Sequence, residues 1–119
     1  MTKYDGYFTR QSPREVVDVL LQLGLTLRNP SNGYIGAFSS SGEEVPIQDE
    51  RGAIKFLLDG NGVSFWVGPN HDVFVSSDSQ GRLVASFDGH TIDEQEALVR
   101  QFREAGLDVV IRHEEEGPP

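Results

Sequence analysis

Two helices with complete start signals lie near opposite ends of the chain, and they limit what the chain can fold into. The first begins at Ser12-Pro13-Arg14-Glu15, where a capping box is combined with proline at the first helical position. Apolar residues then recur at helical spacing up to Gly24, which predicts a helix over residues 13–23. A second capping box, Thr91-Ile92-Asp93-Glu94, opens a helix that ends at Gly106. Both helices carry an apolar stripe, so each should pack against a sheet.

Strand signals fill the rest of the chain. Residues 49–58 are an exception, because apolar residues at helical spacing follow an aspartate cap and predict a short helix. Short runs rich in β-branched and aromatic residues predict strands at 6–9, 25–28, 34–39, 63–67, 72–76, 82–87 and 107–112. We therefore predict an α+β fold: an antiparallel-dominated sheet of five or six strands, with two main helices packed on one face.

The chain of 119 residues has the length of one domain. We assign residues 1–113 to a single α+β domain. Residues 114–119, which contain three glutamates followed by Gly-Pro-Pro, are expected to form a loose acidic and proline-containing tail.

Alternation along the strands of residues 63–87 predicts two different faces. If Val67 faces Asp72 and Ser76 faces Arg82, side chains divide by parity between the faces. The expected core face carries Trp66, Val73, Val75, Leu83, Ala85 and Phe87. The other face carries Phe65, Phe74 and Val84, rimmed by Asp72, Ser76, Arg82 and Ser86. An aromatic centre with a polar rim is typical of a binding surface. The alternative is that residues 49–58 or the N-terminal segment cover these rings.

The net charge narrows the choice of partner. The chain has 19 acidic and 10 basic residues and a formal net charge of −9. Nucleic acids and anionic membranes are disfavoured, because both are bound mainly through lysine and arginine. A basic protein would be attracted instead. Acidic residues gather in the second half of the chain, around Asp88, Asp93 and Glu96.

No residue pattern specifies a catalytic reaction. The chain lacks cysteine, which excludes disulfides, thiolate catalysis and cysteine-bound zinc. His90 with Asp88 and Asp93 could form a weak divalent-metal site, but helix capping explains the helix-terminal acids without a metal. Phosphate-binding loops and nucleophile elbows are absent from the sequence. We therefore expect no enzyme activity, no cofactor and no metal.

The N-terminal residues lack the apolar segment of a secretory signal, and the longest apolar run is too short to cross a bilayer. A cytoplasmic location is expected. In its small size, acidity, absence of cysteine and α+β layout, the chain resembles the immunity proteins of bacterial polymorphic-toxin and contact-dependent inhibition systems. The resemblance covers general architecture and no motif, so no site residue is transferred. It implies a cognate toxin, often a nuclease, that is neutralised by stoichiometric binding through an acidic surface.

The function expected from these observations is that of a protein-binding inhibitor of a basic toxin. Two alternatives from other classes are a self-associating, homodimeric module and a small ligand-binding domain. From the strand faces and the charge distribution, the expected partner-binding residues are Phe65, Phe74, Asp72, Asp88, Asp93 and Glu96.

Overall fold

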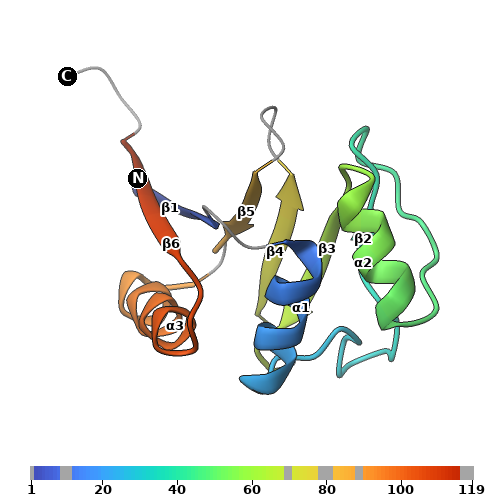
Figure 1. The fold of residues 1–119 in the computed structure, drawn as a ribbon, viewed down its shortest axis with the longest axis horizontal. Helices are drawn as coiled ribbons and strands as arrows, with labels where there is room; N and C mark the ends of the chain where they lie inside the picture. Colours follow the sequence, from blue (N-terminus) through green and yellow to red (C-terminus); the bar gives the residue numbers. More distant parts are fainter. Residues whose placement is uncertain (1, 9–11, 69–70, 78–81, 88–89, 116–119) are drawn as a thin grey trace.

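The computed structural model describes residues 2–8, 12–68, 71–77, 82–87 and 90–115, and for 2–8 and 111–115 it describes the backbone alone. These residues form one six-stranded sheet and three helices (Figure 1). The strands are β1 (Thr2–Phe8), β2 (Ala37–Phe38), β3 (Gly62–Trp66), β4 (Asp72–Ser77), β5 (Leu83–Ser86) and β6 (Val109–Glu115). The helices are α1 (Pro13–Gln22), α2 (Glu50–Leu58) and α3 (Ile92–Glu104).

The strands follow one another across the sheet in the order β2-β3-β4-β5-β1-β6, and all neighbours are antiparallel. The predicted α+β class with an antiparallel sheet is thus confirmed. The finer details match only in part. Residues 25–28, predicted as a strand, make isolated bridges only, and β2 is limited to two residues. At the other end, β6 continues to Glu115, and residues 116–119 of the predicted tail lie outside the described residues.

The helices begin where the capping residues predicted. In α1, the backbone N–H of Glu15 donates to Ser12 Oγ at 3.3 Å, and Ser12 N–H donates back to Glu15 Oε1 at 3.5 Å. The same reciprocal pair forms at α3, between Thr91 and Glu94. Such pairs satisfy N–H groups that the first helical turn leaves without partners. The first residue of each of these two helices is therefore determined by nearby sequence. Packing against the sheet determines only where each helix lies.

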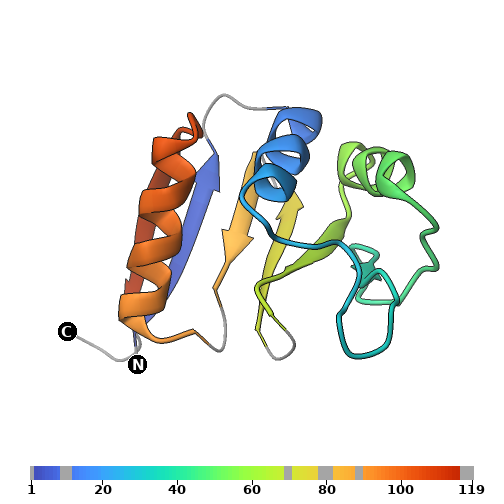
Figure 2. The same cartoon turned by 90° about the horizontal axis from the view of Figure 1, so that it is seen from below.

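All three helices lie on the same face of the sheet (Figure 2). Helix α3 runs along β1 and β6, while α1 and α2 contact each other and α2 contacts β3 and β4. Apolar side chains of both layers meet between helices and sheet. Those most fully buried are Phe65, Phe87, Phe102, Leu20, Leu57, Val16, Val17, Val63, Val73 and Val75.

The register of β3 differs from the prediction by one residue. Trp66, and not Val67, lies opposite Asp72, because the connection to β4 spans residues 67–71, and the N–H of Val67 donates to the carbonyl of His71 at 2.8 Å. A shift by one residue moves every side chain of a strand to the opposite face. The prediction that Phe65 lies on the outer face is therefore wrong: Phe65 is 0% exposed in the core.

Trp66 was assigned to the core face, and that assignment is wrong for the same reason. Its side chain is half-buried on the face away from the helices. The remaining strands keep their predicted faces. Ser76 lies opposite Val84 instead of Arg82, and this shift by two residues leaves the alternation unchanged.

Candidate functional site

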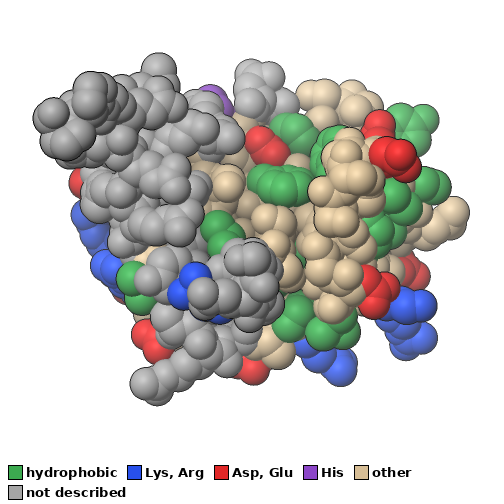
Figure 3. Space-filling model, turned by 90° about the horizontal axis from the view of Figure 1, so that it is seen from above, with side chains coloured by type: hydrophobic (Ala, Val, Ile, Leu, Met, Phe, Trp, Pro, Cys, Tyr) green, Lys and Arg blue, Asp and Glu red, His purple; other side chains and the backbone are tan. Residues whose placement is uncertain are grey.

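The side of the sheet that faces away from the helices carries aromatic side chains that are not part of the buried core. No described helix covers it (Figure 2), and Figure 3 shows hydrophobic side chains near its middle, with an acidic side chain beside them. Side chains on this side come from the strand positions that alternate with the core positions. We call it the outer face, and it comprises Phe38, Ser64, Trp66, Asp72, Phe74, Ser76, Val84 and Ser86.

Two phenylalanines and a glycine build the apolar centre of the outer face. The ring centroids of Phe38 and Phe74 lie 6.0 Å apart at an interplanar angle of 63°, an edge-to-face contact. The ring of Phe74, from β4, lies across β3 at Gly62, where an added Cβ would overlap the ring. The missing side chain of Gly62 thus allows Phe74 to reach β2 and contact Phe38.

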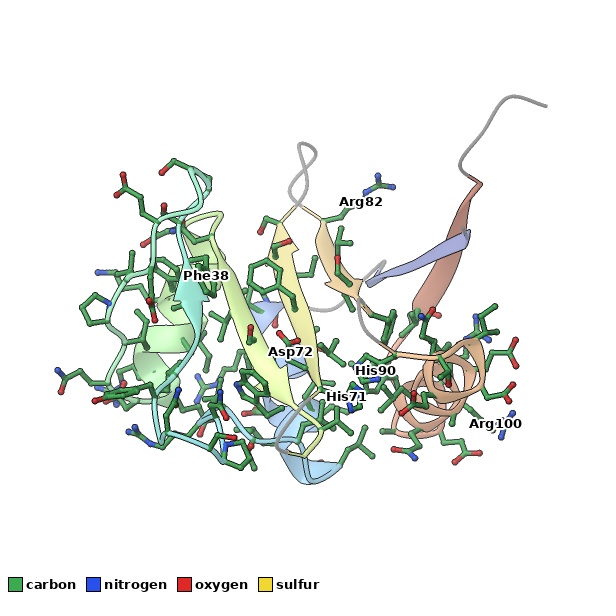
Figure 4. All side chains as sticks on the ribbon, turned by 180° about the vertical axis from the view of Figure 1, so that it is seen from behind. Phe38, His71, Asp72, Arg82, His90 and Arg100 are labelled. Carbon is green, nitrogen blue, oxygen red and sulfur yellow. The ribbon has the colours of Figure 1, made fainter. Side chains whose placement is uncertain are left out.

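A groove of about 250 Å³ opens beside this centre. Its aromatic lining comes from Tyr34, Phe38 and Trp66, and its carboxylates come from Glu44 and Asp72. In Figure 4, Phe38 and Asp72 come from β2 and β4, on either side of β3. The groove is therefore aromatic with acidic groups.

Backbone hydrogen bonds hold two segments to β3 beside this groove, at Thr26 and at Gly36. We call these segments the wall of the groove. The N–H of Trp66 donates to the carbonyl of Thr26 at 2.7 Å, and the N–H of Thr26 donates back to Trp66 at 3.0 Å. Farther along, the N–H of Ser64 donates to the carbonyl of Gly36 at 2.8 Å. The wall thus has a defined position before any partner binds.

Trp66 is the only tryptophan of the chain and lines the groove. Its indole Nε1 is buried and has no hydrogen-bond partner among the described residues. A buried donor without an acceptor costs about 1–3 kcal/mol. Among the described residues, packing and not a side-chain hydrogen bond holds the indole in place.

His71 and His90 lie together near Asp72, the first residue of β4 (Figure 4). Since a carbonyl oxygen can only accept, His90 Nε2 carries the hydrogen that it donates to the Asp72 carbonyl at 2.9 Å. The ring centroids of His71 and His90 are 5.1 Å apart. Gln95 in α3 donates to the carbonyl of His90 at 2.9 Å. These contacts connect the start of α3 to β4, which gives His90 a structural role.

Hydrogen bonds and nearby charges at the start of α3 lower the pKa of Glu94. The hydrogen bond from the backbone N–H of Thr91 lowers the pKa of Glu94, and the Thr91 hydroxyl and the nearby His71 and His90 act in the same direction.

In the described part of the chain, no group of three or more His, Cys, Asp or Glu side chains could hold a metal. Asp88, the third member of the possible site with His90 and Asp93, lies outside the described residues.

The structure brings together only part of the predicted partner-binding set. Phe74 and Asp72 share the outer face, whereas Phe65 is in the core. Asp93 and Glu96 are exposed on α3, in the layer on the other side of the sheet. Three outer-face residues were not placed there from the sequence: Phe38, Ser64 and Trp66.

No protein-family model matches the chain, and neither does any curated protein or solved structure. None of the helices in the described ranges is long and apolar enough to cross a membrane.

Proposed function

We propose that this protein is an inhibitor that binds a basic protein partner through its outer face, as an immunity protein neutralises a cognate bacterial toxin such as a nuclease. One observation carries the proposal. The outer face presents half-buried aromatic side chains, and no described helix covers it. An antiparallel sheet with one solvated face ordinarily turns polar side chains toward water. Phe38, Trp66 and Phe74 depart from that pattern, which a protein partner explains.

The aromatic residues are suited to anchor a partner. Tryptophan and other large aromatic side chains account for much of the binding energy at protein interfaces, particularly near the centre of the buried surface. Here Trp66 and Phe74 come from the neighbouring strands β3 and β4, and Ser76 and Ser86 lie beside Phe74. Such a centre with a polar surround has the anatomy of a protein-binding surface.

The charge of the chain supports a basic partner. A formal net charge of −9 accelerates the approach of a positively charged protein and disfavours acidic ones. Asp72 lies on the outer face itself. Asp93 and Glu96 are in the helical layer, so they would act through the field of the whole molecule and not by contact.

The test is co-expression with the protein encoded by the neighbouring gene, followed by light scattering on the purified material. We expect a 1:1 complex in which the toxic activity is lost, and we expect Phe74→Asp to prevent complex formation. The matched control is Ile92→Asp, because Ile92 is 48% exposed on α3. A complex that survives Phe74→Asp, in a variant shown to be folded by circular dichroism, would contradict binding through the outer face.

A second copy of the chain is the other candidate occupant, because the same apolar centre could bury itself in a homodimer. The charge of −9 on each copy opposes that association. Sedimentation of the isolated protein separates the two possibilities. A dimer that Phe74→Asp dissociates would favour self-association, and a monomer would favour a different partner.

A further inference from the structure

We propose that the groove beside Trp66 binds the guanidinium group of an arginine side chain presented by the basic protein partner. This inference rests on the proposed function for the identity of the partner. The chemistry of the groove itself carries the choice of arginine.

The groove combines aromatic rings with carboxylates. Tyr34, Phe38 and Trp66 line it together with Glu44 and Asp72, and none of the described lining residues is lysine or arginine. A cation is attracted to the face of an aromatic ring within about 6 Å of its centroid. A guanidinium can at the same time donate paired hydrogen bonds to a carboxylate. The residues that line the groove include partners for both kinds of contact.

The carboxylates of the groove have no ion pair with any described residue. Arg28 lies in the adjoining groove, which shares Glu44 and Tyr34 with this one. Its guanidinium already donates to the carbonyls of Gly33 at 2.9 Å and Gln48 at 2.8 Å. The guanidinium of Arg28 is thus engaged with its own loop, and the carboxylates of the groove are left for an external cation.

The groove has room for one side chain. Its volume is about 250 Å³, and the adjoining groove, with which it shares Glu44 and Tyr34, has about 510 Å³. Arginine is favoured over lysine because its guanidinium is planar, stacks on rings and loses less hydration on burial. The chemistry of the lining therefore selects arginine, and the volume of the groove accommodates its side chain.

The wall of the groove is fixed before binding. Asn29 Oδ1 accepts from the N–H of Ser31 at 2.8 Å, and Asn32 Oδ1 accepts from the N–H of Tyr34 at 2.9 Å. These turns hold the segment that carries Tyr34. A preformed site loses less conformational entropy when its ligand arrives.

Because Trp66 is the only tryptophan, the fluorescence of the full-length protein reports on this groove directly. The probe is the amide of N-acetyl-arginine, and the matched probe is the corresponding citrulline amide, which keeps the shape and lacks the charge. We expect a saturable change in emission with the arginine probe, a weaker one with the lysine analogue and none with the citrulline probe.

Charge variants show whether the carboxylates are responsible. We expect Glu44→Gln and Asp72→Asn each to weaken binding of the arginine probe by about tenfold, as the loss of one charged hydrogen bond would. The control is Glu50→Gln, which removes the same charge from the exposed start of α2 and should leave binding unchanged.

An equal response to the citrulline and arginine probes, or no response to either, would overturn the inference. So would carboxylate variants that bind like Glu50→Gln. If the probe fails but the partner complex still forms through Phe74, the arginine site is wrong and the inhibitor proposal stands. If the probe binds as expected and no partner complex forms, the inhibitor proposal is the one that fails.

Discussion

Gly62 and Phe74 form the contact on which the shape of the outer face depends. A Cβ at Gly62 would overlap the ring of Phe74, so Gly62→Ala should displace the ring and remove its contact with Phe38. We expect a loss of about 1–3 kcal/mol in the free energy of unfolding, the usual cost of overpacking. Urea denaturation measures it.

The control for that prediction is the same substitution in a Phe74→Ala background. With the ring removed, the added methyl has space, and the cost of Gly62→Ala should fall close to zero. An equal cost in both backgrounds would show that the strand backbone, and not the ring, is responsible.

Phe65 and Trp66 are adjacent but point to opposite faces, and their truncation should differ accordingly. Phe65 is 0% exposed, so Phe65→Ala should cost about 3–5 kcal/mol. Trp66 is half-buried on the outer face, so Trp66→Ala should cost closer to 1 kcal/mol, an average mutational effect. Thermal or chemical unfolding of the two variants gives the comparison, and the reverse order would contradict the observed register.

The start of α3 makes stability depend on pH through Glu94. Its pKa is lowered in the folded protein from an ordinary value of 4.5, chiefly by the hydrogen bond from the backbone N–H of Thr91. A carboxyl group whose folded pKa is depressed stabilises the protein above its unfolded pKa, and the stabilisation is lost as the pH falls through the folded pKa. Glu94→Gln keeps the cap and removes the charge.

We therefore expect the melting temperature of the natural protein to fall further between neutral and acidic pH than that of Glu94→Gln. Scanning calorimetry over that range measures the difference. Parallel curves for the two proteins would mean that the charge of Glu94 contributes nothing to the stability of α3.

Local sequence was enough to predict the helices, because each capping box is a set of hydrogen bonds between residues three positions apart. The face to which each side chain of β3 points depends on the register of β3 against β4, and the length of the connection between the two strands sets that register. Residues 67–71 form that connection, and counting one residue fewer exchanged Phe65 with Trp66. Ser64 indicates the correct faces, because a polar residue between Val63 and Phe65 marks the outward side of β3.

The groove could not have been predicted from the sequence. It joins Tyr34 and Glu44, from segments on either side of β2, with Asp72 of β4. Those positions meet only because β3 pairs with both β2 and β4. No local pattern encodes such a meeting of separate strands.

In the proposed function, the two sides of the molecule contribute differently to binding. The helical layer carries exposed acids such as Asp93 and Glu96, and the outer face carries the aromatic side chains proposed to anchor the partner. Reversing Asp93 and Glu96 to lysine should therefore slow association with a basic partner and leave dissociation nearly unchanged. Association rates at low and high salt test this, and a reversal that mainly accelerates dissociation would place α3 inside the interface.

The most direct measurement of the central claim is the dissociation rate of the partner complex when the outer face is truncated. Trp66→Ala and Phe74→Ala are compared with Ile92→Ala, whose side chain is exposed on the helical side. We predict that each outer-face variant, with its fold intact, dissociates faster by an amount equivalent to about 2 kcal/mol or more, while Ile92→Ala behaves like the natural protein. Dissociation rates that remain unchanged in both outer-face variants would contradict binding through the outer face.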